Sequence, residues 1–183
     1  MEVKRSNVTE KLQTELVEAA LDGDIDSFGR LARRYYASMV AVAYSILADH
    51  QLAEDAAQEA FARALTSLSK LRKPDKFAPW LAQICRNVAK DMVAAKARTI
   101  NPRDLSGAPD SNKPDDSIEA VRRAIEQLSV SAREVIVLRY YNGLSYEEIS
   151  SVLGISKPTI NGRLTRAKRK MARYLKRDGF LES

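Results

Sequence analysis

The stretch LSYEEISSVLGISKPTINGRLTRAKRKM, residues 144–171, predicts a short helix, a tight turn and a longer second helix. Ser145 and Glu148 form the capping-box pattern that begins a helix, and Ser131 and Glu134 form the same pattern earlier in the chain. Gly154 stands where a left-handed backbone conformation ends one. Ser156 can then cap the second helix, whose first turn tolerates Pro158. This order of elements is typical of a helix-turn-helix.

The second helix of this segment sorts its side chains by chemistry along its length. Short polar and arginine side chains near its beginning could meet base edges in a major groove, and the basic residues that follow could lie along phosphates. Compensation of the helix dipole is a competing explanation, but it needs one or two cations rather than a run. The candidate DNA contacts are Lys157, Thr159, Asn161, Gly162, Arg163, Arg166, Lys168, Arg169 and Arg173.

Whole-chain composition narrows the classes of function. The net charge of the 183 residues is +6, and residues 118–183 alone carry an excess of six positive charges, which favours a polyanionic partner. A single Cys and a single His make a conventional zinc site very unlikely and exclude an internal disulfide. There is no signal-peptide pattern and no long apolar run, so we expect a cytoplasmic protein without membrane insertion. We expect no cofactor, no metal and no enzymatic activity.

Residues 99–117 separate two helical patterns. They contain three of the six prolines and no aromatic residue, and neither helical nor strand periodicity, so they favour a flexible linker over an ordered loop. Residues 1–98 and 118–183 show apolar residues at helical spacing and no useful strand alternation. The sequence therefore predicts an all-α protein of two small helical domains, 1–98 and 118–183.

Two further motifs allow a family to be recognised. They are LAEDAAQEAFARAL, residues 52–65, followed by KFAPWLAQICRNVAKD, residues 76–91. With the segment LSVSAREVIVLRYYNGLSYEEISSVLGISKPTINGRLTRAKRKM, residues 128–171, they resemble the bacterial RNA polymerase sigma factors of the extracytoplasmic-function type. The resemblance covers roughly residues 16–176. It implies that residues 1–98 correspond to sigma region two and residues 118–183 to region four.

The resemblance also implies partners and site residues. Region two of this family binds the clamp helices of the polymerase β′ subunit, which assigns Asp55, Gln58 and Glu59 to that contact; a solvated polar face is the alternative. Region two also opens and recognises the −10 promoter element. The candidates for this role are Lys76, Phe77, Trp80, Gln83, Arg86, Asn87 and Lys90. For Trp80, partial burial in the core is the competing interpretation.

Region four of the family binds the β flap and recognises the −35 element as duplex, which assigns the helix-turn-helix residues above to that element. An anti-sigma factor is a further expected partner. Asn161 and Gly162 depart from the family pattern, so the −35 sequence cannot be inferred, and Pro79 leaves the start of its helix open. The alternative function is a free-standing helix-turn-helix regulator that does not join polymerase.

Overall fold

The computed structural model describes residues 2–99 and 116–180, and all of its regular elements within those ranges are helical. The first domain contains α1 (Glu2–Leu21), α2 (Ile25–Leu47), α3 (His50–Ser67) and α4 (Phe77–Thr99), with short 3-10 turns Leu68–Lys70 and Pro74–Lys76 before α4. The second contains α5 (Asp116–Glu126), α6 (Val130–Ile136), the π-helical turn Val137–Tyr141, α7 (Tyr146–Leu153) and α8 (Lys157–Arg177). The predicted all-α class with two helical domains is confirmed. The proposed linker, 99–117, lies mostly outside the described residues.

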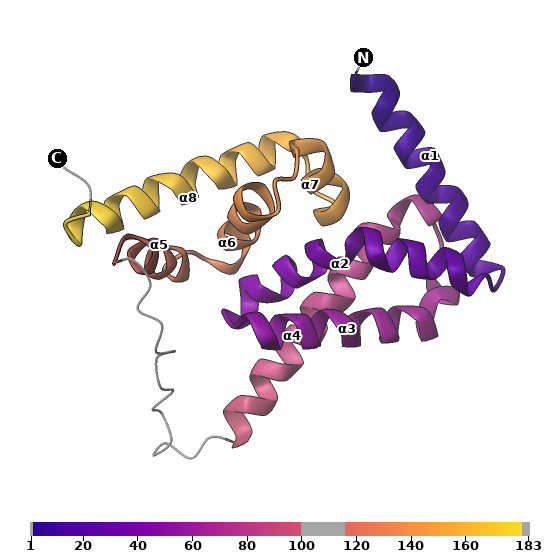
Figure 1. The fold of residues 1–183 in the computed structure, drawn as a ribbon, viewed down its shortest axis with the longest axis horizontal. Coiled ribbons are helices and arrows are strands. Elements are labelled where there is room, and N and C mark those ends of the chain that lie inside the picture. The colour runs from indigo at the N-terminus through magenta and orange to yellow at the C-terminus, as the bar shows by residue number, and fades with distance from the viewer. Residues whose placement is uncertain (1, 100–115, 181–183) are drawn as a thin grey trace.

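The first domain is built on the contact of α2, α3 and α4 (Figure 1). Asp24 caps α2 by accepting from the backbone N–H of Asp26 at 3.0 Å. The buried face of α3 consists mostly of alanine, namely Ala53, Ala56, Ala57, Ala60 and Ala64. Small side chains let neighbouring helices approach closely, so larger residues of α2 and α4 fill the space between them. Leu65 lies at helical spacing from this face, yet the residue remains 46% exposed.

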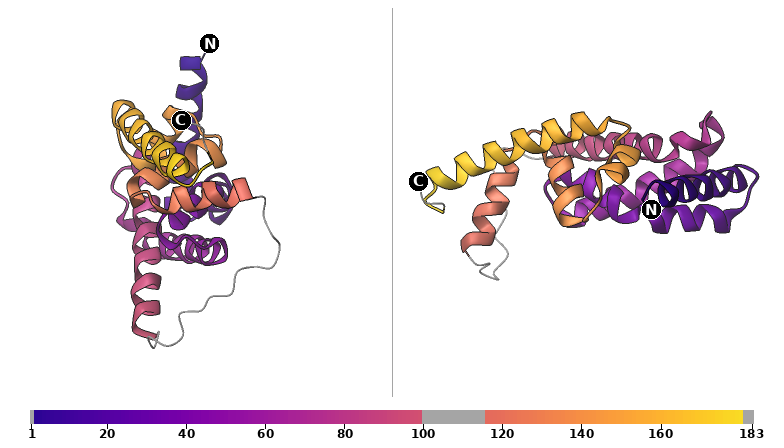
Figure 2. Two further views of the ribbon diagram at one scale, coloured as in Figure 1. Left: turned by 90° about the vertical axis from the view of Figure 1, so that its left-hand side faces the viewer. Right: turned by 90° about the horizontal axis from the view of Figure 1, so that it is seen from above.

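The second domain places α8 across the molecule, with α7 packed against its N-terminal half and α5 against its C-terminal half (Figures 1 and 2). The capping box predicted for α7 is present: the Ser145 hydroxyl accepts from the Glu148 backbone at 3.2 Å, and the Glu148 carboxylate accepts from the Ser145 backbone at 2.8 Å. Ser156 caps α8 as predicted. Ile149 and Ile160 are fully buried, which fixes α7 against α8.

The same pattern gave a wrong prediction at Ser131 and Glu134. Helix α6 begins after Ser129, and Glu134 is buried instead of reaching back to a helix N-terminus. The buried residues form a cluster that runs through both domains, since α6 packs on α2 and α7 packs on α4. Within the described residues, the two domains are therefore in direct contact.

Candidate nucleic-acid interface

The turn of the helix-turn-helix is held by a glycine and a serine. Gly154 has φ +67°, the left-handed conformation that the sequence predicted, and its backbone N–H donates to the Ser150 carbonyl at 2.9 Å. The Ser150 hydroxyl donates to the carbonyl of Ile155 at 2.7 Å, which closes the turn from the other side. These bonds set the direction in which α8 leaves α7.

The face of α8 that carries the candidate DNA contacts is largely exposed. Lys157, Thr159, Asn161, Arg166, Lys168, Arg169 and Arg173 are exposed, whereas Gly162 and Arg163 are half-buried. Several of these side chains have intramolecular contacts that would orient them: Lys157 pairs with Glu147, and the Lys168 ammonium lies 5.1 Å from the centre of the Tyr140 ring. The Lys157 ammonium lowers the pKa of the Glu147 carboxyl through that contact.

Because Gly162 has no side chain, the surface of α8 has a small gap at this position. A Cβ at this position would lie 3.6 Å from the Arg166 Nη1, an ordinary van der Waals distance. Packing therefore does not require a glycine here, and the guanidinium of Arg166 lies beside the gap. The sequence departure at Gly162 changes the shape of the exposed surface rather than the fold.

The polar stripe on α4 is present, but its members differ in exposure. Gln83, Asn87 and Lys90 are exposed, and the Gln83 amide donates to the Asn87 carbonyl oxygen at 3.0 Å. Trp80 is half-buried, with its ring 6.0 Å from that of Phe77. The ring of Trp80 packs on the core and keeps some exposed surface. The partial burial expected for it is present, and the exposed part stays a candidate for contact with the −10 element.

Two residues assigned to the −10 element are placed differently from the others. Phe77 is fully buried and contacts the rings of Phe28 and Tyr35, so in this structure it is a core residue of α4 with no surface for a base. Arg86 is mostly buried, and its Nε donates to the Glu134 carboxylate of α6 at 2.9 Å. Lys76 is exposed and pairs with Asp75 at 2.9 Å.

The polar face of α3 is exposed. Asp55, Gln58 and Glu59 point away from the alanine face. Glu59 accepts from Arg63 at 2.7 Å, and Arg63 also donates to Asp91 of α4 at 3.3 Å. This exposed pairing raises the pKa of Arg63, chiefly through the hydrogen bond to Glu59.

An open cavity of about 660 Å³ lies between the two domains. Gln83, Arg86 and Lys90 of α4 line one side, while Glu134 of α6 and Arg163 of α8 line another. The folded chain thus brings three candidates for the −10 element and one for the −35 element to the same cavity. The sequence did not indicate this juxtaposition, because it arises from contact between the domains.

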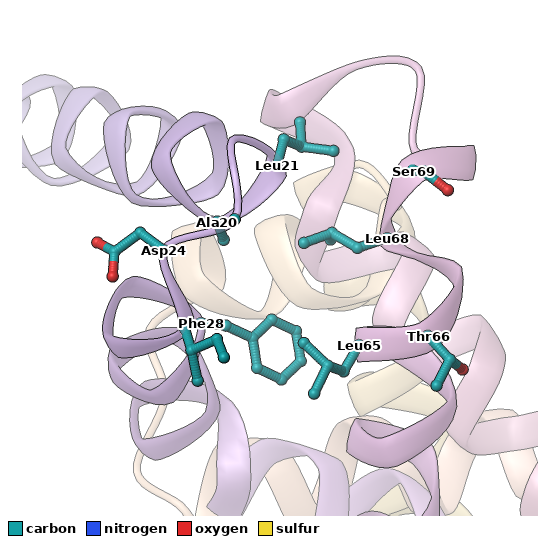
Figure 3. A pocket seen from close by; sticks show the side chains of 10 residues that line it. Ala20, Leu21, Asp24, Phe28, Leu65, Thr66, Leu68 and Ser69 are labelled. Atoms are coloured by element: carbon teal, nitrogen blue, oxygen red, sulfur yellow. The ribbon is translucent and has the colours of Figure 1, made fainter.

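A second pocket, of about 260 Å³, lies between the end of α1 and the end of α3 (Figure 3). Leu21, Phe28, Leu65 and Leu68 give it a largely apolar lining. None of the residues predicted to contact polymerase or DNA lines it.

No helix among the described residues is long and apolar enough to cross a membrane, and no cluster of metal-ligating side chains occurs in those same ranges.

Comparison with known proteins identifies both halves of the chain. Residues 31–99 match the family described as Sigma-70 region 2, and residues 118–171 match Sigma-70, region 4. The RNA polymerase sigma-H factor of Pseudomonas aeruginosa is 30% identical over 178 residues, which cover 88% of this chain and 92% of that protein. The probable RNA polymerase sigma factor RfaY of Xanthomonas campestris is 35% identical over 173 residues. That alignment covers 86% of this chain and 42% of RfaY, so the chain spans less than half of that relative.

A solved structure has the same fold: CnrH, determined in complex with the cytosolic domain of CnrY, aligns with a TM-score of 0.61 and 26% identity. The alignment covers 92% of this chain and 99% of CnrH. The chain belongs to the sigma-70 family of RNA polymerase sigma factors, in its extracytoplasmic-function group.

Proposed function

We propose that this protein is a sigma factor that binds core RNA polymerase and directs promoter-specific initiation of transcription in the cytoplasm. The observation that carries the proposal is the presence, in one chain, of an exposed polar face on α3, a polar stripe on α4 and a basic helix-turn-helix. A free-standing regulator would need only the helix-turn-helix. It would leave the α3 face and the α4 stripe without a partner.

Each surface has its own task in this proposal. Asp55, Gln58 and Glu59 meet the β′ clamp helices, and their exposure on one face of α3 supports this contact. Lys76, the exposed part of Trp80 and the stripe of Gln83, Asn87 and Lys90 meet the melted −10 element, where amides can bond base edges and rings can stack on bases. Phe77 supports this surface from the core.

The second domain recognises the −35 element as duplex. The first half of α8 enters the major groove with Thr159, Asn161, Arg163 and Arg166, while the basic residues further along lie near phosphates. The same domain contacts the β flap. A protein inhibitor of the anti-sigma kind is a further proposed partner; the similar CnrH was solved bound to another protein, the cytosolic domain of CnrY.

The test is run-off transcription with purified core polymerase on a library of promoters with randomised −35 and −10 elements. We expect transcripts from a subset of templates that share both elements. The double variant Asp55→Ala/Glu59→Ala should weaken binding to core while leaving the circular dichroism spectrum and melting temperature nearly unchanged. A control is Glu119→Ala on α5, which removes a half-buried acid from the second domain, outside the α3 face.

Failure of the full chain to bind core polymerase would contradict the proposal. Binding of duplex DNA without any polymerase-dependent transcript would instead favour the free-standing regulator.

A further inference from the structure

We propose that Tyr140, in the π-helical turn between α6 and α7, is a positioning residue for DNA binding. Its ring holds the Lys168 ammonium of α8 in place for a phosphate of the duplex that carries the −35 element. The inference rests on the function proposed above, in which α8 enters the major groove. It extends the DNA interface from α8 onto a segment that the proposed function leaves without a task.

The π-helical turn gives Tyr140 a fixed backbone beside α8. The Asn142 N–H donates to the Val137 carbonyl at 3.1 Å, five residues back, so this turn is wider than an α-helical one. Arg139 donates from Nη1 to the Leu144 carbonyl at 2.7 Å and bonds the turn to the segment that follows it. Tyr140 therefore projects from a backbone that is bonded on both sides, although 56% of the residue is exposed.

The ring of Tyr140 lies against a cation of α8. The Lys168 ammonium is 5.1 Å from the ring centre, within the range of about 6 Å over which an aromatic face attracts a cation. No carboxylate among the described residues pairs with Lys168, whereas Lys157 at the start of α8 pairs with Glu147. The charge of Lys168 is thus oriented without being neutralised, and it stays available to an anion.

Lys168 lies on the same flank of α8 as Asn161, one of the residues proposed to enter the major groove. The two positions are about two helical turns apart, so their side chains point to the same side. The Tyr146 hydroxyl lies 3.5 Å from the Asn161 Oδ1, so tyrosines border this flank at both levels. A helix that begins in the groove passes the bordering strand further along, where a lysine meets phosphates.

An ammonium that is already in place binds a phosphate more tightly than one on a freely rotating side chain. Lysine has a long, flexible stem, and ordering it on binding costs conformational entropy. The ring covers one side of the ammonium and leaves other N–H donors for a phosphate oxygen. The contact between Tyr140 and Lys168 can therefore persist in the complex and reduce the entropy that binding costs.

The experiment titrates the full chain on a duplex of randomised sequence across a salt series, because contacts with phosphates do not depend on the bases. Tyr140→Leu leaves the charge of the chain unchanged, and we expect it to weaken binding by about two- to fivefold. The dependence of affinity on salt should also fall toward that of Lys168→Ala, because the same phosphate contact is lost. Tyr140→Phe keeps the ring and should match the unmodified chain in both measurements.

The neighbouring Tyr141 provides the matched control. It belongs to the same turn, is 78% exposed and contacts no cation within the described residues, so Tyr141→Leu should bind DNA like the unmodified chain. In the Lys168→Ala background, Tyr140→Leu should have no further effect, because the ring then has no ammonium to hold. Additive losses would overturn the positioning role.

A spectroscopic measurement reports on the contact without DNA. The ring current of Tyr140 shifts the NMR resonances of the methylene protons next to the Lys168 ammonium. Tyr140→Leu should remove this shift, and Tyr140→Phe should retain it. Equal Lys168 resonances in both variants would overturn the contact itself. If Tyr140→Leu lowers the melting temperature, Tyr140→Gln provides a second variant without a ring.

The outcomes separate the role of Tyr140 from the proposed function. Unchanged affinity and salt dependence in Tyr140→Leu would overturn the positioning role, even if run-off transcription succeeds. A loss in Tyr140→Phe as large as in Tyr140→Leu would overturn it too, because the hydroxyl and not the ring would then act. Weaker binding to core polymerase with unchanged DNA affinity would place Tyr140 in a polymerase contact and also overturn it. The expected DNA effects in a chain that supports no transcription would contradict the proposed function and leave the positioning role supported.

Discussion

Arg133 of α6 donates to the carbonyl of Ser45 in the last turn of α2, 88 residues earlier in the chain, at 3.1 Å. Its other nitrogens donate to the carbonyls of Ile125, Glu126 and Leu128, at 3.2, 2.7 and 3.4 Å. One guanidinium thus bonds carbonyls in the last turn of α5 and just beyond it, and joins them to the first domain. Five fixed donors suit arginine to this role, and lysine cannot reproduce them.

Arg133→Ala should therefore lower the free energy of unfolding more than loss of a surface charge would. Several carbonyls lose a charged donor together, and hydrogen bonds to charged groups contribute about 1.5–3 kcal/mol each, so we expect a loss of about 2–4 kcal/mol. Urea denaturation of the full chain measures it. Arg133→Lys should recover only part of the loss, and Arg122→Ala, which removes an exposed arginine, should cost little. An effect of Arg133→Ala as small as that of Arg122→Ala would contradict this role.

Gly154→Ala should destabilise the protein through two separable effects. A left-handed backbone costs a residue with a side chain about 1–2 kcal/mol. The added Cβ also meets Pro79 at 3.0 Å, too close without a shift. A double-mutant cycle with Pro79→Ala separates the two, because the clash depends on both positions. Additive losses in the unfolding free energy would show that the added Cβ at position 154 does not clash with Pro79.

The two halves of α8 should differ in their effect on DNA binding. Arg166→Ala should reduce the preference for the cognate −35 element, by about 1–3 kcal/mol, more than the affinity for random duplex. Lys168→Ala/Arg169→Ala should weaken both alike and lower the salt slope by roughly one unit per lost phosphate contact. Titration of each variant of the full chain on both duplexes across a salt series provides the measurement. Equal ratios of specific to non-specific loss would mean that α8 is only an electrostatic anchor.

Cys85 should be almost unreactive in the folded protein. Its thiol is fully buried and contacts the Met39 carbonyl, and burial raises its pKa from 9.0 to about 12. Alkylation at pH 8 should be far slower than at a cysteine placed on the exposed position Ser69. Rapid alkylation under native conditions would contradict the burial of this side chain.

The raised pKa of Cys85 also makes the free energy of unfolding depend on pH in the alkaline range. The raised pKa means that the folded state holds the proton more tightly than the unfolded state. The contribution is complete below pH 9 and is lost as pH rises from about 9 toward 12. The unfolding free energy of the unmodified chain should therefore fall over this range relative to that of Cys85→Ala, which lacks this ionisable group.

Local sequence patterns predicted the helices and their ends because the interactions that form them span only a few residues. The capping box of Ser145 and Glu148, the left-handed Gly154 and the exposed face of α3 all follow from residues within a turn or two of each other. The polar stripe of α4 could be located in the same way. The roles of these residues toward polymerase and DNA stay predictions.

Only the tertiary structure decided the use of residues that meet partners from distant parts of the chain. Ser131 and Glu134 have the same spacing and chemistry as Ser145 and Glu148, yet Glu134 pairs with Arg86, 48 residues away, and caps nothing. Phe77 shares a segment with exposed Lys76 but is enclosed by α2. Local spacing cannot predict these outcomes, because burial and the choice of a charged partner depend on which helices pack together. A carboxylate enclosed by that packing is stabilised by a cation within reach, whatever its neighbours in sequence would favour.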